Sequence, residues 1–507
     1  MTSETKAALK DCEWTFEKLE YFDGIISDVA DSFGLTTYPN QIEIISSEQM
    51  MDAYSSVGMP IGYNHWSYGK KFIQTQQNYH RGQMGLAYEI VINSNPCISY
   101  LMEENSLTMQ ALVIAHACYG HNSFFKNNYL FTTWTDADSI IDYLVFAKKF
   151  VSDCEEKYGV KAVEDTLDSC HALMNLGVDR YKRPAKISLH EERNRQDERE
   201  AFLQAQVNDL WRTIPKIKAV NEQKSKKRFP EQPQENLLYF IEKNAPLLKS
   251  WQRELVRIVR KIAQYFYPQR QTQVMNEGWA TFWHYTIINT LFDQGKVDDS
   301  FMMEFFHHHT NVVFQPPYNS PHYSGINPYT LGFSMFCDIK RICEHPTDED
   351  KAWFPEMAGS NWLETLHFAC KNFKDESFIS QYLSPHLIRE LKLFNTLDDD
   401  KSNYIEIDAI HNEQGYLKIR EALSQQYNLS HLEPNIQVYN VDVTGDRSIT
   451  LRHYAHHNIS LGKSVDEILK HLYRLWGFEV ILERESEDGE VKEIARCPKA
   501  PSEDKTG

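Results

Sequence analysis

Two long apolar segments of this chain carry histidine and glutamate side chains, and this combination constrains the fold more than any other feature. One segment is LTMQALVIAHACYG, which ends at Gly120 and follows Ser106, a candidate helix N-cap. The other is MNEGWATFWH, which spans Met275–His284. A helix that is apolar on every side has to be buried. The sequence therefore predicts a helical core that contains ionisable groups.

The chain is expected to be an α+β protein in two parts. A mainly helical body over residues 1–394 precedes a small C-terminal α/β domain over 395–485 and a flexible tail over 486–507. In the second part the predicted order is strand, helix, strand, strand, helix, strand, which is typical of a ferredoxin-like βαββαβ unit. Residues 186–234 are densely charged and are expected to form a linker or an insertion.

Periodicity predicts the elements of the body. The expected strands are 41–45 and 86–92, and residues 58–72, rich in glycine and aromatic residues, are expected to form an ordered loop. The expected helices cover residues 4–34, 106–120, 136–157, 160–176, 235–266, 272–294 and 298–310.

Charge and composition narrow the classes of partner and compartment. The formal net charge is −18, which disfavours binding to nucleic acid and to anionic membranes. No run of about 18 apolar residues is found, and the first twenty residues have no apolar signal region. The nine cysteines form no CxxC pair, as expected for reduced thiols. We expect a cytoplasmic protein with neither a nucleic-acid nor a membrane partner.

The strongest local signal for chemistry is the pair Glu277 and His284. They are seven residues apart, so both lie on one side of a helix. A carboxylate and an imidazole placed so suit a metal or an acid–base pair. The alternative is structural, with a glutamate at the helix N-terminus and a histidine satisfied in the core.

A second signal is the pair His116 and His121. Residues five apart do not share a face of an ideal helix, so these side chains converge only if the helix ends or bulges near Gly120. Further candidates are His171, seven residues after Glu164, and Glu254 on the helix before Glu277. Four helices with such residues also suit a di-metal bundle, although its Glu-x-x-His signature is missing here.

Two aromatic and polar loops are candidate ligand sites, and core packing is the alternative for both. One loop would bind a planar or sugar-like ligand, and the other would line a pocket. The candidate substrate-binding residues of the two loops are His65, Trp66 and Tyr68, and His309, Asn311, Gln315 and Tyr329.

The motifs together resemble one family. GMPIGYNHWSYGKKF, AYEIVINSNPCISYLMEEN, HACYGHNSFFKNNYLF, GVDRYKRP, NEGWATFWHY, HTNVVFQPPY and INPYTLGFSMFCDIKR are similar to segments of the SpoVR (stage V sporulation protein R-like) family. The resemblance implies a cytoplasmic bacterial protein linked to spore cortex formation, or to stress and stationary-phase physiology in bacteria without spores. It also implies a functional link to a PrkA-type serine protein kinase and its companion protein.

A second likeness concerns chemistry. NEGWATFWHY is similar to the segment of gluzincin metallopeptidases that supplies the third zinc ligand, and VIAHACYGH is similar in setting to their zinc helix. This likeness implies a gluzincin-like body in which His116, His121 and Glu277 bind one divalent metal, zinc favoured. His284 would be a fourth ligand or would support one. The base that follows the first histidine in gluzincins is replaced by Ala117.

Three functions follow from these patterns. The first is a metal-dependent hydrolase of an amide or peptide bond, with Glu277, Glu254 and His171 as candidate catalytic residues and Glu89 and Glu103 as further candidate bases. The second is a non-catalytic regulatory protein that binds a partner. The third is a di-metal oxidative enzyme.

Overall fold

The computed structural model divides the chain into two compact units, which we name the helical unit and the sheet unit. The helical unit comprises Met1–His171, Lys249–Pro434 and His456–Leu461, and the sheet unit comprises Ala172–Leu248, Asn435–Ala455 and Gly462–Gly507. The structure describes residues 13–56, 61–80, 89–181, 228–318, 320–321, 323–394, 396–397, 406–455, 461–462, 464–486 and 488–498.

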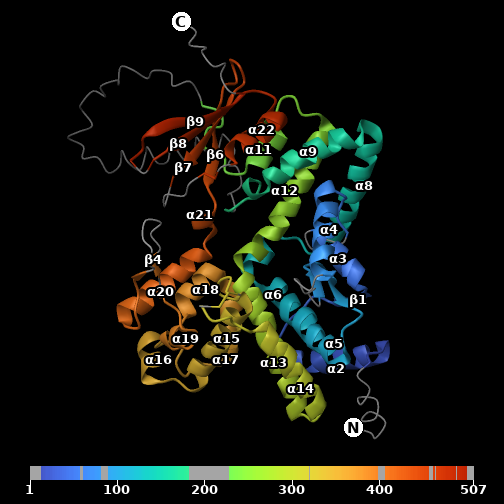
Figure 1. Ribbon diagram of the computed structural model, residues 1–507, viewed down its shortest axis with the longest axis vertical. Helices are drawn as coiled ribbons and strands as arrows, with labels where there is room; N and C mark the ends of the chain where they lie inside the picture. The colour runs from blue at the N-terminus through green and yellow to red at the C-terminus, as the bar shows by residue number, and fades with distance from the viewer. Residues whose placement is uncertain are drawn as a thin grey trace, which may run out of the picture. The chain divides into compact units, whose positions relative to one another are not determined.

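The helical unit (Figure 1) contains most of the helices. Its elements are α2 (Phe16–Ser32), β1 (Asn40–Ile45), α3 (Ser47–Ser55), α4 (Trp66–His80), β2 (Glu89–Ile92), β3 (Cys97–Met102), α5 (Leu107–Ile114), the π-helix η1 (Ala115–His121), α6 (Asn122–Asn127), α7 (Tyr129–Trp134), α8 (Ile140–Tyr158), α9 (Val160–Ala172), α12 (Ser250–Gln271), α13 (Gln273–Asp293), α14 (Asp299–Val312), α15 (Pro328–Glu344), α16 (Asp348–Trp353), α17 (Trp362–Asn372), α18 (Asp375–Tyr382), α19 (Pro385–Glu390), β4 (Thr396–Leu397), β5 (Glu406–Ile407), α20 (Glu413–Gln426) and α21 (Leu429–Leu432).

The sheet unit is built on a four-stranded sheet of order β6-β7-β8-β9. Only the central pair, β7 and β8, is parallel. Trp476 of α22 stacks on Phe240 of α11 at 6.0 Å between ring centroids, and both helices contact the sheet. The elements are the 3₁₀ turn η2 (Met174–Leu176), α11 (Leu237–Asn244), β6 (Asn435–Val441), β7 (Ile449–Tyr454), α22 (Val465–Trp476), β8 (Val480–Glu485) and β9 (Val491–Cys497).

Helix α13 lies at the centre of the helical unit, alongside α15 (Figure 1). Trp279, Phe282 and Trp283 are buried, and the helix is apolar on most of its surface. Glycine allows the close packing: a methyl group added at Gly332 of α15 would lie 2.7 Å from the Cα of Gly278 in α13. Such a distance is too short for carbon atoms, so the two helices are in backbone contact here.

The N-terminus of α13 is capped by a side chain from another helix. The carboxylate of Asp375, the first residue of α18, accepts hydrogen bonds from the backbone N–H groups of Val274 and Met275 at 2.9 and 2.8 Å. These donors have no partner within the helix, and a carboxylate also complements the positive end of the helix dipole. The cap therefore fixes the position at which residues 276–278 of α13 enter the core.

A three-stranded sheet stands beside the helices in the same unit, in the order β1-β3-β2. The central strand β3 pairs in parallel with β1 and antiparallel with β2. The strand predicted over 86–92 is therefore an edge strand, formed by Glu89–Ile92. Residues 81–88 lie outside the described part of the chain.

The boundary between the two parts differs from the prediction at residue 395. Contacts divide the chain at Pro434, because the predicted first helix of the C-terminal domain (α20) packs on α18 and α19 of the helical unit. The predicted first strand contributes only the two-residue β5, which pairs with β4 in a separate ribbon. The ferredoxin-like order is therefore absent from the described residues, and the sheet contains β6, β7, β8 and β9 instead.

Three local predictions were also wrong. The tail expected to be flexible over 486–507 contains strand β9, which pairs with β8 and so belongs to the sheet. The helix expected over 235–266 is two helices, α11 and α12, because the chain breaks at Ala245–Leu248 around Pro246. The loop expected over 58–72 contains the start of α4 at Trp66, and residues 57–60 lie outside the described part. In contrast, α13 matches the predicted 272–294 closely. Among the described residues, no helix is long and apolar enough to cross a membrane.

The glycine contact between α13 and α15 predicts a stability effect. Gly332→Ala should lower the free energy of unfolding by about 1–3 kcal/mol, because the methyl group forces two backbones apart. Gly24→Ala in α2 is the matched control, since a methyl group there meets no atom within 4 Å. It should stabilise the helix by about 0.5–1 kcal/mol. Urea unfolding measures both, and equal effects of the two variants would contradict the packing argument.

Candidate metal centre

A π-helix brings His116 and His121 together. In η1 the backbone N–H of Asn122 donates to the carbonyl of Ala117, five residues earlier. A turn closed by i→i+5 bonds places residues five apart one above the other. The two imidazole rings lie 4.6 Å apart between centroids. The predicted bulge is therefore present, and it extends over the whole segment from Ala115 to His121.

Two carboxylates face the Nε2 atoms of these histidines. Glu277 of α13 places its Oε2 3.4 Å from His121 Nε2 and 3.9 Å from His116 Nε2. Glu89 of the edge strand β2 places its Oε1 3.7 Å from His116 Nε2. Glu89, His116 and His121 offer ligand atoms that all lie within 4.8 Å of one another. Four potential ligands from three separate elements thus converge.

The Nδ1 atoms of His116 and His121, on the far side of each ring from the carboxylates, contact other side chains. His121 Nδ1 donates to Oδ1 of Asn276 at 2.9 Å, and His116 Nδ1 lies 2.9 Å from Nδ1 of His284. The Nε2 of His284 in turn lies 2.9 Å from Nδ1 of His309. With Nδ1 protonated, the lone pair of each Nε2 atom points toward the carboxylates, which is the usual arrangement in metal sites.

On the carboxylate side of the site, His121 and Glu277 repel each other electrostatically. Burial lowers the pKa of His121 to about 4, against an opposing effect of Glu277, so the ring is neutral at pH 7. Its Nε2 lone pair therefore faces Oε2 of Glu277, and this one oxygen atom is buried and has no hydrogen-bond partner. Two acceptors this close repel each other, and a cation between them would remove the repulsion.

The two carboxylates have different pKa shifts. For Glu277, burial raises the pKa, but His121, His116 and a hydrogen bond from Tyr329 together outweigh it, and the net pKa is lowered. For Glu89, burial dominates and the pKa is raised, with Glu277 adding to the effect and His116 opposing it. Titratable groups whose environments shift their pKa values in opposite directions are candidates for different acid–base roles.

The site is open on its carboxylate side. The side chains of His116 and His121 are 4% and 8% exposed, whereas those of Glu89 and Glu277 are 17% and 21% exposed. Tyr329 of α15 is also in this site, and its ring stacks on His116 at 6.4 Å. The proximity of Glu277 and burial both raise the pKa of Tyr329, so its hydroxyl stays protonated and can donate.

His284 does not face the carboxylates. Both of its ring nitrogens contact other imidazoles, those of His116 and His309. Burial, followed by these neighbouring histidines, keeps the pKa of His284 well below its ordinary value. His284 therefore supports the ring of His116, one of the two roles that the gluzincin likeness implied.

Four other predicted residues form a separate cluster. The rings of His65 and His171 lie 4.5 Å apart, and the hydroxyl of Tyr63 lies 2.5 Å from His171 Nε2. Trp66 donates to Asp168 at 2.8 Å. Tyr68 lies against His65 and His171. The structure thus brings the aromatic loop to α9, and places His171 in this cluster rather than beside Glu277.

The remaining predicted residues are dispersed. Glu254 forms an ion pair with Arg257 one turn along α12, and the candidate base Glu103 is exposed. Asn311 contacts His307 on the exposed side of α14. Gln315 lies in the loop before α15, where its side chain bonds to the backbone of Pro316, Gly325 and Asn327. Asn276 was not singled out from the sequence, although its position beside Glu277 was a usable signal.

Comparison with known proteins covers nearly the whole chain. The family model described as SpoVR like protein matches residues 13–432, and the one described as SpoVR-like C-terminal domain matches residues 434–487. Protein YcgB of Escherichia coli (strain K12) is 66% identical over 498 residues, which are 98% of each chain. No solved structure matches. The two matched ranges meet where contacts divide the chain, near Pro434.

The neutral state of His121 can be tested by titration. In protein stripped of metal by a chelator, nitrogen-edited NMR should show His121 taking up its proton near pH 4, rather than near the ordinary 6.5. The unfolded chain binds this proton first, so the free energy of unfolding falls as pH drops from about 6.5 toward 4. Glu277→Gln removes a charge that favours the imidazolium and should lower the midpoint further, whereas Glu103→Gln should not. A midpoint near 6.5, or a rise in the Glu277→Gln variant, would contradict this assignment.

Proposed function

Since the chain belongs to the SpoVR-like family, we propose that its helical unit is a metal-dependent hydrolase of an amide or peptide bond. One observation carries the proposal: two imidazoles and two carboxylates from η1, α13 and β2 converge on one small space. Asn276 accepts from Nδ1 of His121 and so favours the tautomer that a metal requires, and His284 is placed to accept from Nδ1 of His116.

His116, His121 and Glu277 would hold the ion. Two histidines and one glutamate form the ligand set of several catalytic zinc sites that retain an open position, so zinc is the favoured ion. Such an ion polarises a carbonyl group and makes water nucleophilic at neutral pH. The gluzincin likeness agrees in its ligands, while the five-residue histidine spacing is accommodated here by a π-helix.

Glu89 takes the part of the general base. Burial raises its pKa, which makes it a stronger proton acceptor than an ordinary carboxylate, and its Oε1 lies 3.7 Å from His116 Nε2, on the open side of the site. The hydroxyl of Tyr329 donates to Glu277 in the free protein, and it is placed to donate to an oxygen that develops negative charge on a substrate. This division of roles replaces the base that Ala117 cannot provide.

The substrate class follows from the family rather than from the pocket. We propose a peptide or amide in a cell-wall precursor, which would connect the reaction with spore cortex formation, or with stress and stationary-phase physiology. A cytoplasmic location, and a functional link to a PrkA-type kinase and its companion protein, belong to the same proposal.

Two other functions make different predictions about metal. A regulatory protein without catalysis would hold no ion, and its histidine and glutamate cluster would be structural. Two histidines and one carboxylate are also the ligands of non-haem iron(II) oxygenases. A di-metal centre needs a second set of ligands, and among the described residues only one group has this geometry.

Metal content tests the site directly. Plasma mass spectrometry on tag-free protein should find about one equivalent of zinc per chain. His116→Ala and Glu277→Ala should lose it while remaining folded by circular dichroism, because each removes one of three ligands. Asn276→Ala should weaken affinity about 10- to 100-fold by freeing the ring of His121. An absence of metal even after reconstitution would contradict the proposal, and coloured iron would favour oxidative chemistry.

Glu89→Gln separates metal binding from catalysis. The variant should keep its zinc but lose at least about 100-fold in hydrolysis of peptidoglycan stem peptides, since the base contributes that much. Glu103→Gln, which changes an exposed carboxylate beyond the end of β3, is the matched control and should hydrolyse at the rate of the unmodified protein. Equal rates for Glu89→Gln and Glu103→Gln would remove Glu89 from the mechanism.

A further inference from the structure

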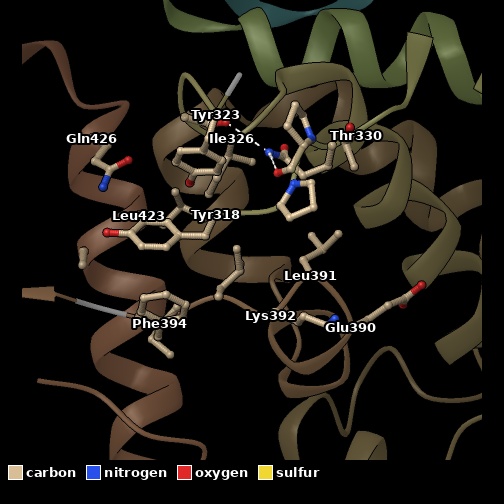
Figure 2. A pocket seen from close by; sticks show the side chains of 17 residues that line it. Tyr318, Tyr323, Ile326, Thr330, Glu390, Leu391, Lys392, Phe394, Leu423 and Gln426 are labelled. Atoms are coloured by element: carbon tan, nitrogen blue, oxygen red, sulfur yellow. Dashed lines mark hydrogen bonds between the residues drawn. The ribbon is translucent and has the colours of Figure 1, made fainter. Parts of the chain in front are cut away.

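A separate hollow of about 840 Å³ lies within the helical unit, between the loop before α15, the end of α19 and α20 (Figure 2). Its volume is that of a site for a small organic molecule. The residues that line it include Tyr318, Tyr323, Leu391, Lys392, Phe394 and Leu423. None of them belongs to the metal centre.

Aromatic rings form one wall of this hollow. The ring of Tyr318 lies edge-on to those of Tyr323 and Phe394, at 5.3 and 5.2 Å between centroids. Tyr318 and Phe394 are 51% and 37% exposed, although large aromatic rings are usually buried. Aromatic rings that stay exposed around a concave surface are typical of a wall against which a flat or apolar ligand packs.

The polar groups that line the hollow fall into two sets. Gln315 and Thr330 are occupied by backbone groups of their own loop, and Glu390 lies 3.5 Å from His386. In contrast, no hydrogen bond or ion pair within the described part of the chain engages the following side chains: Tyr318, Tyr323, Lys392 and Gln426. Each of these four can donate a hydrogen bond, and only Lys392 carries a charge.

Lys392 occupies a backbone position that normally belongs to glycine. Its φ is 54°, in the left-handed region. The N–H of Leu393 bonds to the carbonyl of Ile388, and that of Lys392 to Arg389, so Lys392 is the residue that ends α19 in a Schellman motif. A lysine is strained there. Residues in a strained backbone conformation cluster at functional sites. The functional group that Lys392 would contribute to the hollow is its ammonium group.

We propose that this hollow binds a small carboxylate with an aromatic body, with the ring against Tyr318 and Phe394 and the carboxylate on Lys392. The free donors favour an anion, and among the described lining residues the only carboxylate, Glu390, already has His386 as a neighbour. This site is independent of the proposed hydrolase activity, which would use α13, η1 and β2.

The test uses three probes that differ only in their head group: 3-phenylpropionate, 3-phenylpropanamide and 3-phenylpropylamine. Ligand-observed NMR on metal-free, full-length protein should show binding of the carboxylate, with the amide and the amine at least about tenfold weaker. Lys392→Gly and Lys392→Gln should each weaken the carboxylate about tenfold, as expected for loss of a charged hydrogen bond. Lys148→Gln, at an exposed lysine of α8, is the control and should bind as the unmodified protein does.

Stability measurements separate loss of the site from loss of the fold. Lys392→Gly should unfold at the same or a higher temperature, because glycine relieves the left-handed strain while the ammonium is lost. Ala422→Trp should fill the hollow from α20 and abolish binding, and His116→Ala should leave the affinity unchanged. Equal affinity for carboxylate and amide, no effect of Lys392→Gln, or no binding at several millimolar would each overturn the proposal.

Discussion

The candidate metal centre depends on how closely α13 can approach its neighbours. A methyl group at Gly120 would lie 2.6 Å from the Cα of Ala280, so η1 is in contact with the backbone of α13. Gly278 and Gly332 allow the same closeness to α15 on another side. Glu277 lies between these two crossings. Its distance to the histidines on η1 and to Tyr329 on α15 is therefore set by backbone contact, which is stiffer than side-chain packing.

The orientation of the two histidine rings depends on the side chains that contact their Nδ1 atoms. Asn276 and Glu277 are adjacent on α13, yet one holds the rear of His121 while the other faces its front. His284, two turns along the same helix, holds His116. One helix thus supplies a candidate ligand and the supports of both imidazoles. A shift of α13 would disturb all of them together, and the Asp375 cap at its N-terminus resists such a shift.

Much of this arrangement could be predicted from the sequence. The apolar run around Glu277 gave the bounds of α13 almost to the residue, and Ser106 caps α5 as expected by accepting from Met109. Spacing also identified both histidines. It could not show that a π-helix aligns them. The α-helix and the π-helix differ in whether each N–H bonds to the carbonyl four or five residues earlier, and in the sequence only Gly120 marks this change.

Other features depend on tertiary contacts that no local pattern records. Glu89 could not be ranked above Glu103 or Glu254, because only the pairing of β2 at the sheet edge brings it to His116. The boundary near 395 was misplaced because α20 is amphipathic. The sequence of such a helix does not show whether its apolar side packs on the helical unit or on the sheet unit. It packs on α18 and α19, and the four hydrogen-bond donors of the hollow, including Lys392, likewise come together only through that packing.

The π-helix makes the length of the chain between His116 and His121 part of the site. A segment one residue shorter would place the two histidines four apart, and an ordinary α-helix would then present them on one face. A segment one residue longer would align them in neither kind of helix. Homologues of this protein can therefore lose a residue here and keep both imidazoles in register, while a single insertion would separate them without changing any ligand.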